Sequence, residues 1–321
     1  VVSQPATGSA TANADGSITY TAPSDASGDV TFTYTVDDDD GATSNEATVT
    51  VTVDQPTSAV PVTSGLVTHF DAGQGVATSN GAVTGWADQS GQGNDLTASG
   101  NPTLVTDGPN GEPMMSFDGG SDGSGDLLQR TDALSGLPNG SDDRTVMYVV
   151  NYQNSPNFGG GVAYGAPACN QAFGLIVHNS DLWVQGWCED FDSGAAADVG
   201  PGGWMTQSAV LSGDQLTHYK NGTQIDQYTH TYDTDPQKLV IGAELDESPY
   251  VDMEVAEVVV YDRALTDTER QAVENYFDQK YFAANQPPTA SDDSASVTAD
   301  QSTTVDVLAN DDDPDGTLDA S

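Results

Sequence analysis

The sequence predicts an all-β fold, with a β-sandwich or jelly roll as the architecture. Two observations predict it. Short segments in which Val, Tyr or Phe alternates with Thr recur along the chain, and this period of two is typical of half-buried strands. The central part of the chain, about 200 residues, contains many strands but only one convincing helix. Its apolar strand faces must therefore be buried between sheets. The 321 residues suggest about two domains.

The first segment, residues 1–53, and the last, residues 286–321, share a style of alternating strands and acidic runs. A stretch rich in Thr, Pro, Ser and Val, residues 54–64, predicts a linker after the first segment. Strands are expected at 17–21, 30–36, 47–53 and 302–308. The acidic runs contain Asp37, Asp39, Asp292, Asp293, Asp311, Asp313 and Asp315.

Residues 65–283 are expected to form the large central unit. A hairpin is predicted at 219–225, because Asn221-Gly222 is a strong turn signal between two strands. The helix is predicted to begin after Thr266 as N-cap, with Glu269 completing a capping box. Further strands are expected at 66–70, 145–150, 174–178, 182–187, 207–211, 217–219, 239–241 and 255–261.

The charge of the chain excludes two classes of partner. Seven Lys and Arg residues stand against 49 Asp and Glu, which gives a formal net charge of −42. Such a surface repels nucleic acids and anionic membranes, so neither is expected as a direct partner. The hydrophobic content of 36% is too high for a disordered acidic tail. Asp threaded between Gly, Asn and Ser is typical of calcium-binding loops and also suits solubility in a saline medium, and we expect both to apply.

The two cysteines, Cys169 and Cys188, predict one disulfide in an oxidising compartment, although two free buried thiols are also compatible with the sequence. No apolar run approaches the roughly 18 residues of a transmembrane helix, so membrane insertion is not expected. No signal peptide opens the chain, and its first residues read as the interior of something longer. We therefore expect a fragment of a larger secreted protein.

The two terminal segments resemble the cadherin-like, Ig-like repeats of giant bacterial adhesins of the RTX type. Residues 285–293 and 305–316 resemble the opening half of such a repeat, and residues 16–53 resemble the closing half. Either the chain is cut through two successive repeats, or the two halves pair into one β-sandwich with the large unit inserted; we favour pairing, within a chain or between neighbouring chains. The resemblance implies neighbouring repeats of a parent adhesin as partners and a place on the bacterial cell surface.

The large unit resembles the laminin G-like domains of the concanavalin A-like jelly-roll superfamily. This resemblance implies two antiparallel sheets and a role in binding carbohydrate or protein, without identifying a ligand. The blocks that carry it are Leu66-Val67-Thr68-His69-Phe70-Asp71-Ala72, residues 83–95, Phe117-Asp118-Gly119-Gly120 and residues 256–265.

Calcium is the cofactor that the acidic runs predict. Four carboxylates fall within five residues at 311–315 and repel one another unless a cation lies among them. The runs at 37–40 and 292–293 are expected to supply further ligands. Two Gly-rich loops of the large unit carry acidic and amide side chains that could either bind calcium or hydrogen-bond the backbone of their own turns. Their candidate ligands are Asp88 and Asn94 in one loop and Asp118 and Asp122, with Asp126, in the other.

Aromatic residues predict the ligand site. Trp187 and Trp204 lie among acidic and Gly-rich stretches that suit an exposed platform, on which the apolar face of a sugar can stack. Trp183 and Trp187 are four positions apart on the strand expected at 182–187, so both side chains should lie on the same face of the sheet. For Trp183 we favour packing in the core. The other candidate ligand-binding residues are Asp190, Asn170, Gln171 and Tyr152, in loops that the Cys169–Cys188 link would hold.

Catalysis is not expected. A Glu-x-Asp-x-x-Glu strand would place the paired carboxylates of a retaining glycoside hydrolase on one face. The pattern begins at Glu244-Leu245-Asp246, but Pro249 occupies its last position, and Glu254-Val255-Ala256-Glu257 lacks the middle Asp. The histidines show no zinc-ligand spacing.

The sequence thus predicts a non-catalytic module of a calcium-dependent bacterial surface adhesin, whose jelly roll binds an extracellular or cell-surface glycan. The alternatives are a structural spacer or protein-binding module, and the accessory domain of a polysaccharide-degrading enzyme. Exposure of Trp187 and Trp204 beside a groove would favour the lectin, and burial of both would favour the spacer.

Overall fold

The computed structural model describes residues 2–6, 8–12, 18–21, 28–36, 42–53, 59–120, 125–132, 134–155 and 159–282. The chain divides into two compact units, Val1–Ala59 and Val60–Ser321. The strand predicted at 302–308 lies outside the described residues, so pairing of the terminal segments stays a prediction. The same holds for the predicted calcium ligands Asp37, Asp39, Asp122, Asp292, Asp293, Asp311, Asp313 and Asp315.

Within its described residues, the small unit contains two antiparallel strand pairs. The strand β1 (Ser9–Ala12) pairs with β2 (Ile18–Thr21), and β3 (Gly28–Tyr34) pairs with β4 (Ala47–Val53). Strand alternation buries Phe32, and its ring stacks on the ring of Tyr20 with the two ring centroids 6.4 Å apart. The strands predicted from period-two alternation are therefore confirmed here.

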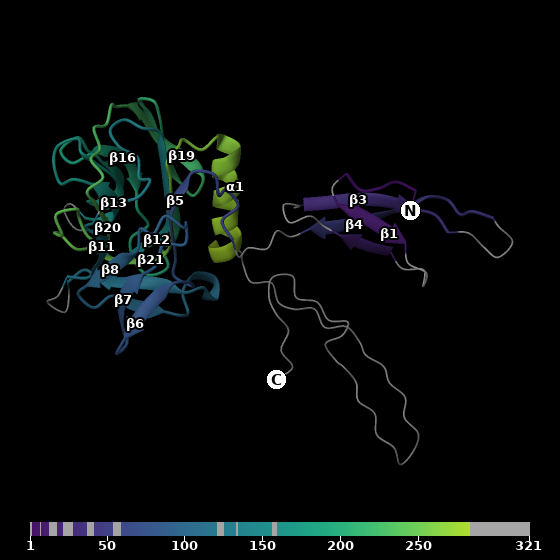
Figure 1. The fold of residues 1–321 in the computed structure, drawn as a ribbon, viewed down its shortest axis with the longest axis horizontal. Coiled ribbons are helices and arrows are strands. Elements are labelled where there is room, and N and C mark those ends of the chain that lie inside the picture. Colours follow the sequence, from purple (N-terminus) through teal and green to yellow (C-terminus); the bar gives the residue numbers. More distant parts are fainter. Residues whose placement is uncertain are drawn as a thin grey trace, which may run out of the picture. The chain divides into compact units, whose positions relative to one another are not determined.

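The large unit is a sandwich of two antiparallel sheets, as predicted (Figure 1). Within the described residues, one sheet has the strand order β19-β18-β17-β12-β21-β10-β9, with β5 also paired to β21. Its strands are β5 (Leu66–Asp71), β9 (Thr103–Val105), β10 (Met114–Asp118), β12 (Arg144–Tyr152), β17 (Met205–Ser212), β18 (Gln215–Lys220), β19 (Thr223–Thr229) and β21 (Asp252–Tyr261). We call it the helix-side sheet.

The other sheet, which we call the pocket-side sheet, has the order β16-β15-β14-β13-β20-β11-β8-β7-β6 among the described residues. Its strands are β6 (Val76–Ser79), β7 (Ala82–Trp86), β8 (Leu96–Ser99), β11 (Leu127–Arg130), β13 (Gly161–Gly165), β14 (Ala172–His178), β15 (Asp181–Gln185), β16 (Phe191–Ala196) and β20 (Lys238–Ile241). A short 3₁₀ turn, η1 (Pro109–Gly111), precedes β10.

Strand alternation divides the described apolar residues of the large unit among three clusters. In β12, Tyr148 points into the core between the sheets, whereas Met147 and Val149 face the helix α1 (Asp267–Phe277). On the pocket-side sheet, Ala163 and Val240 face outward and are buried beneath the loop that follows β20. The outer face of the pocket-side sheet therefore has a small apolar cluster of its own.

The predicted capping box is confirmed at the start of α1. The Thr266 hydroxyl accepts a hydrogen bond from the Glu269 N–H at 3.3 Å, and Glu269 Oε2 accepts one from the Thr266 N–H at 2.9 Å. The helix continues into a π-helical turn, η2 (Asp278–Phe282). Within the described residues, no helix combines the length and apolar character needed to cross a membrane.

Thr266→Ala should lower the free energy of unfolding by about 1 kcal/mol, because it removes the N-cap oxygen. Thr268→Ala is the matched control, since Thr268 is exposed inside the same helix and should tolerate Ala. Urea unfolding of both variants checks this, and equal stability of the two would contradict it.

The large unit begins within the predicted linker and contains the predicted hairpin. The end of the predicted linker packs onto this unit, since Val60 is buried and the Tyr261 hydroxyl donates to the Val62 carbonyl at 2.9 Å. The predicted hairpin is confirmed, with positive φ at Asn221 (49°) and Gly222 (72°), as a type I′ turn requires.

Candidate functional site

A pocket of about 320 Å³ opens beside the end of β15 and is the candidate functional site. Residues from β15 and the loop after it form one side, and residues from the loop after β20 form the other. The lining residues are Gln185, Trp187, Cys188, Asp190, Glu244, Asp246, Ser248 and Pro249.

Trp187 lies in a tight turn rather than in a strand, because β15 ends at Gln185. Asp190 fixes this turn, since its Oδ1 accepts hydrogen bonds from the N–H groups of Gly186 and Trp187, both at 2.9 Å. Trp187 and Cys188 have φ angles of 57° and 66°, a left-handed conformation that costs roughly 1–2 kcal/mol per residue. The turn therefore needs support from its surroundings.

The Cys169–Cys188 disulfide provides part of that support. It joins the turn to the loop between β13 and β14, and the Asn170 N–H donates to the Trp187 carbonyl at 3.0 Å. The indole of Trp187 packs, half-buried, against the outer apolar cluster of the pocket-side sheet. These contacts hold the ring at the edge of the pocket.

Glu244 and Gln185 form the buried end of the pocket. Their side chains are 5% and 2% exposed, and Gln185 Nε2 donates a hydrogen bond to Glu244 Oε2. Gln185 Oε1 is buried without a partner. Burial raises the pKa of Glu244 to about 7; the Gln185 hydrogen bond opposes this shift, and the charges of Asp190 and Asp246 add to it.

Of the predicted ligand-binding residues, the structure brings Trp187 and Asp190 together in the pocket. Asn170 lies next to the disulfide, where its Oδ1 accepts from His230 Nε2 at 2.7 Å and its Nδ2 donates to the Thr231 carbonyl at 3.0 Å. Gln171 precedes β14 and is half-buried outside the pocket lining. Asn170 thus supports the turn rather than lining the pocket.

Three aromatic expectations need correction. Tyr152 is fully buried between the sheets, where its hydroxyl contacts Tyr148, so it cannot meet a ligand in the pocket. Trp204 packs against the apolar cluster beneath α1, on the opposite sheet from Trp187. Trp183 faces outward on β15, half-buried and 4.6 Å from the His178 ring, and is not a core residue. The two tryptophans of the expected platform are thus separated by the thickness of the sandwich.

A calcium role for the loop at Asp88 stays a prediction, and the structure shows its side chains bonded to neighbouring backbone and side-chain groups. Asp88 Oδ1 accepts from the N–H groups of His69 and Ser90, and Oδ2 accepts from the Ser90 hydroxyl and the Asn94 N–H. A carboxylate offers about four lone-pair positions, and all are occupied here. Asn94 Oδ1 accepts from the Ser135 N–H at 2.8 Å. These residues bond their own turn and tie it to neighbouring loops.

The Asp118 loop has a similar local role in its described part. Asp118 Oδ1 accepts from the Gly120 N–H at 2.8 Å. Asp126 accepts from the N–H groups of Asn101 and Asp118, at 2.6 and 3.3 Å. A calcium role for this loop stays a prediction.

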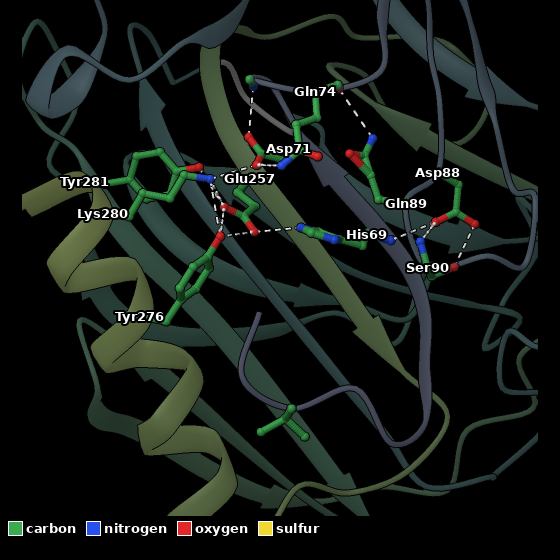
Figure 2. Close-up of polar contacts among 12 residues, drawn as sticks. His69, Asp71, Gln74, Asp88, Gln89, Ser90, Glu257, Tyr276, Lys280 and Tyr281 are labelled. Atoms are coloured by element: carbon green, nitrogen blue, oxygen red, sulfur yellow. Dashed lines mark hydrogen bonds and ion pairs between the residues drawn. The ribbon is translucent and has the colours of Figure 1, made fainter. Parts of the chain in front are cut away.

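A second polar cluster lies beneath the helix, where three potential metal ligands, His69, Asp71 and Glu257, are close together (Figure 2). A cation is already present, because Lys280 Nζ donates to Asp71 Oδ2 at 2.8 Å and to Glu257 Oε2 at 2.9 Å. Tyr276 also points toward Glu257 in Figure 2 and donates to it at 3.0 Å. The cluster therefore joins α1 and η2 to β5 and β21 and does not fit a metal centre.

Sequence reasoning missed Gln185, Ser248 and Pro249 as lining residues and did not assign Glu244 or Asp246 to the ligand site. A signal for the acidic pair existed, since Glu244-Leu245-Asp246 begins the hydrolase-type pattern. For Gln185, strand parity grouped it with Trp183 and Trp187 on one face, but nothing in the sequence indicated its pairing with Glu244.

The two units match different families. Residues 1–55 match the family model of the bacterial cadherin-like domain, and residues 122–269 match that of the concanavalin A-like lectin/glucanases superfamily. The architecture suspected from the sequence is thus confirmed for these ranges. No curated protein matches the chain.

Solved structures share the fold of the large unit. Domain 4 of AbnA, a GH43 extracellular arabinanase from Geobacillus stearothermophilus, in complex with arabinotriose, is 16% identical; the match covers 66% of this chain and 97% of that domain, with a TM-score of 0.49. A mutant GH54 α-L-arabinofuranosidase soaked with 4-nitrophenyl α-L-arabinofuranoside is 13% identical, with 66% and 59% coverage and a TM-score of 0.51. The binding domain of botulinum neurotoxin DC in complex with SialylT is 11% identical, with 66% and 52% coverage and a TM-score of 0.46. Of these, the GH54 match has a TM-score above 0.5, and at 13% identity it shows the fold alone.

Proposed function

We propose that this chain, a bacterial cadherin-like domain joined to a concanavalin A-like lectin/glucanase domain, is a carbohydrate-binding module, and that its sugar site is the pocket beside β15. The apolar face of a sugar ring stacks on Trp187, and its hydroxyls donate hydrogen bonds to the acceptors around it.

One observation carries this proposal: the pocket combines an aromatic ring with hydrogen-bond acceptors that the protein leaves available. Trp187 is half-buried, so part of its side chain packs on the protein and part meets solvent. Gln185 Oε1, buried and unpaired, needs a donor, and an unpaired buried acceptor costs about 1–3 kcal/mol. A sugar hydroxyl supplies that donor.

We further propose that the module belongs to a secreted, calcium-dependent adhesin and that neighbouring repeats flank it. Support comes from the net charge of −42 and from the acidic runs, which need a cation to offset their mutual repulsion. The bacterial cadherin-like match at residues 1–55 is consistent with this setting.

Trp187→Ala is expected to weaken glycan binding by about thirtyfold, or about 2 kcal/mol, as is usual for a central aromatic contact. A glycan array with millimolar calcium, repeated with excess chelator, identifies the ligand class, and titration calorimetry then gives the affinity of each variant. Trp204→Phe is the matched control, because Trp204 packs on the opposite sheet and should leave the affinity unchanged. Equal affinity of Trp187→Ala and the wild type would remove the site. Absence of glycan binding in calcium would favour the spacer.

A glycoside hydrolase is the second candidate function, and one observation favours it. A buried carboxyl with its pKa raised to about 7, like that of Glu244, is suited to general acid catalysis, and two further carboxyls lie in the same pocket. Incubation of the bound glycan with the wild type and Glu244→Gln, followed by chromatography, separates the two functions. Hydrolysis product that forms with the wild type but not with Glu244→Gln would show that the chain is an enzyme rather than a binding module.

A further inference from the structure

The pocket contains three carboxyl groups, from Asp190, Glu244 and Asp246. Among its described lining residues there is no Lys, Arg or His. Lys238 lies on β20, before the loop that carries Glu244, but it is engaged elsewhere. Its Nζ donates to the Leu245 carbonyl at 3.0 Å and to Glu247 Oε1 at 2.7 Å. The acidic groups of the pocket therefore lack a cation of their own.

An independent observation points to a ligand that donates hydrogen bonds. Gln185 is 2% exposed, lines the pocket and has an unpartnered Oε1, while its Nε2 is committed to Glu244. A hydroxyl donates one hydrogen bond, whereas an ammonium donates three and carries a positive charge. A single ammonium can therefore satisfy the amide oxygen and two carboxylates together.

We propose that the pocket selects an amino sugar, whose free ammonium group lies between Gln185 Oε1 and the Glu244 carboxylate while its ring stacks on Trp187. This inference rests on the proposed function of the pocket and names its substrate class. The chain as a whole favours the same choice, because its net charge of −42 attracts cationic glycans and repels glycans that carry carboxylate or sulfate.

Proton release is the signature that this arrangement predicts. Burial raises the pKa of Glu244 to about 7. The charges of Asp190 and Asp246 also raise this pKa, whereas the hydrogen bond from Gln185 lowers it. The carboxyl is therefore about half protonated at pH 7 without ligand. A bound ammonium stabilises the carboxylate and lowers this pKa, so binding at pH 5.5, where the amine of the ligand is protonated, releases a proton from Glu244. Near pH 7 the release is smaller, because Glu244 is already partly ionised and the amine of the ligand begins to lose its own proton.

The test is calorimetric titration of the full chain with a fully de-N-acetylated β-1,4-glucosamine tetramer and with its fully N-acetylated counterpart. Titrations at pH 5.5 and 7.0, in buffers of different ionisation heat, count the released protons. We expect the free-amine tetramer to bind at least about tenfold more tightly than the acetylated one, because hydrogen bonds to charged groups contribute more than those to neutral groups.

Glu244→Gln is expected to weaken binding of the free-amine tetramer by about ten- to a hundredfold and to abolish proton release. Its affinity for the acetylated tetramer should fall less, because a hydrogen bond between neutral groups contributes less than one to a charged group. The matched control is Glu189→Gln, which removes the same charge from an exposed residue of the neighbouring turn that does not line the pocket. It should leave both affinities and the proton count unchanged.

Tetralysine controls for general attraction between a polycation and an acidic chain. Binding of tetralysine as tight as that of the free-amine tetramer would overturn the inference, and so would an equal loss in Glu189→Gln and Glu244→Gln. Trp187-dependent binding of the acetylated tetramer without a preference for the free amine would also overturn it, while the proposed carbohydrate-binding function would stand. Binding of neither tetramer overturns it as well, and the glycan array then decides the proposed function separately.

Discussion

Lys280→Met is expected to lower the free energy of unfolding of the large unit by about 3–5 kcal/mol, because it leaves buried carboxylates without their cation. Lys280 Nζ lies between Asp71 and Glu257, whose side chains are 5% and 0% exposed. Glu257 also accepts hydrogen bonds from Tyr276 and from Tyr281, the latter at 2.7 Å (Figure 2). Loss of the ammonium therefore weakens the attachment of the helix to the sheet. Urea unfolding at pH 7 measures the effect.

Lys220→Met is the matched control for this substitution. Lys220 pairs with Asp198 at 2.8 Å, but that carboxylate is 57% exposed. Water already solvates such a pair, so its loss should cost about 0–1 kcal/mol. A cost for Lys280→Met no greater than that for Lys220→Met would show that the buried cluster does not hold the helix.

The difference between the wild type and Lys280→Met should narrow as the pH falls. Burial alone would raise the pKa of Glu257, but its hydrogen bond from His69 and the charge of Lys280 outweigh burial and hold that pKa below its ordinary value. In the wild type this contribution to stability is complete above the unfolded pKa, near 4.5, and is lost as the pH falls through the folded pKa. In Lys280→Met the Glu257 carboxyl is protonated at a higher pH than in the wild type. As the pH falls, the cost of burying a carboxylate without its cation therefore disappears, and the two free energies of unfolding approach each other.

Replacement of both Cys169 and Cys188 by Ser should lower the free energy of unfolding by about 3 kcal/mol on the chain-entropy description of a loop of this size. The two cysteines are separated by 19 positions. Cys188 follows Trp187 in a turn in which both residues have positive φ angles. Without the disulfide this turn is less well held, so the double Ser variant should also bind the ligand about tenfold or more weakly. Thermal unfolding and calorimetry of the double variant check both effects.

Trp187→Ala serves as the comparison for the disulfide variant, because it should weaken binding while it leaves the disulfide intact. If the disulfide holds the turn, the double Ser variant loses both stability and affinity. A double Ser variant that unfolds and binds like the wild type would contradict a supporting role for the disulfide.

Much of the local structure could be predicted because its causes are local. The capping box at Thr266 and the turn at Asn221-Gly222 depend on residues within one or two turns of backbone, and both were identified correctly. The strand at 145–150 was also found, but its extension to Arg144–Tyr152 depends on pairing with β17 and β21. Strand ends were less predictable than strand centres because neighbouring strands decide them.

The aromatic platform shows why periodicity alone could not assign the site. Parity placed Trp183 and Trp187 on one face, yet β15 ends at Gln185, where the turn fixed by Asp190 begins. Trp204 is close to Trp187 in sequence but precedes β17, which belongs to the other sheet. Sequence proximity therefore did not translate into proximity in space.

By itself, the sequence determined the all-β class, the two kinds of unit, the cap of the helix and the strongly acidic character of the chain. Only the tertiary structure decided the pocket. Gln185 and Glu244 lie 59 positions apart and meet because the loop after β20 folds over the outer face of the pocket-side sheet, where its apolar residues pack into the small outer cluster. The burial that raises the pKa of Glu244 and leaves Gln185 Oε1 unpaired arises from that packing, and no pattern of neighbours along the chain encodes it.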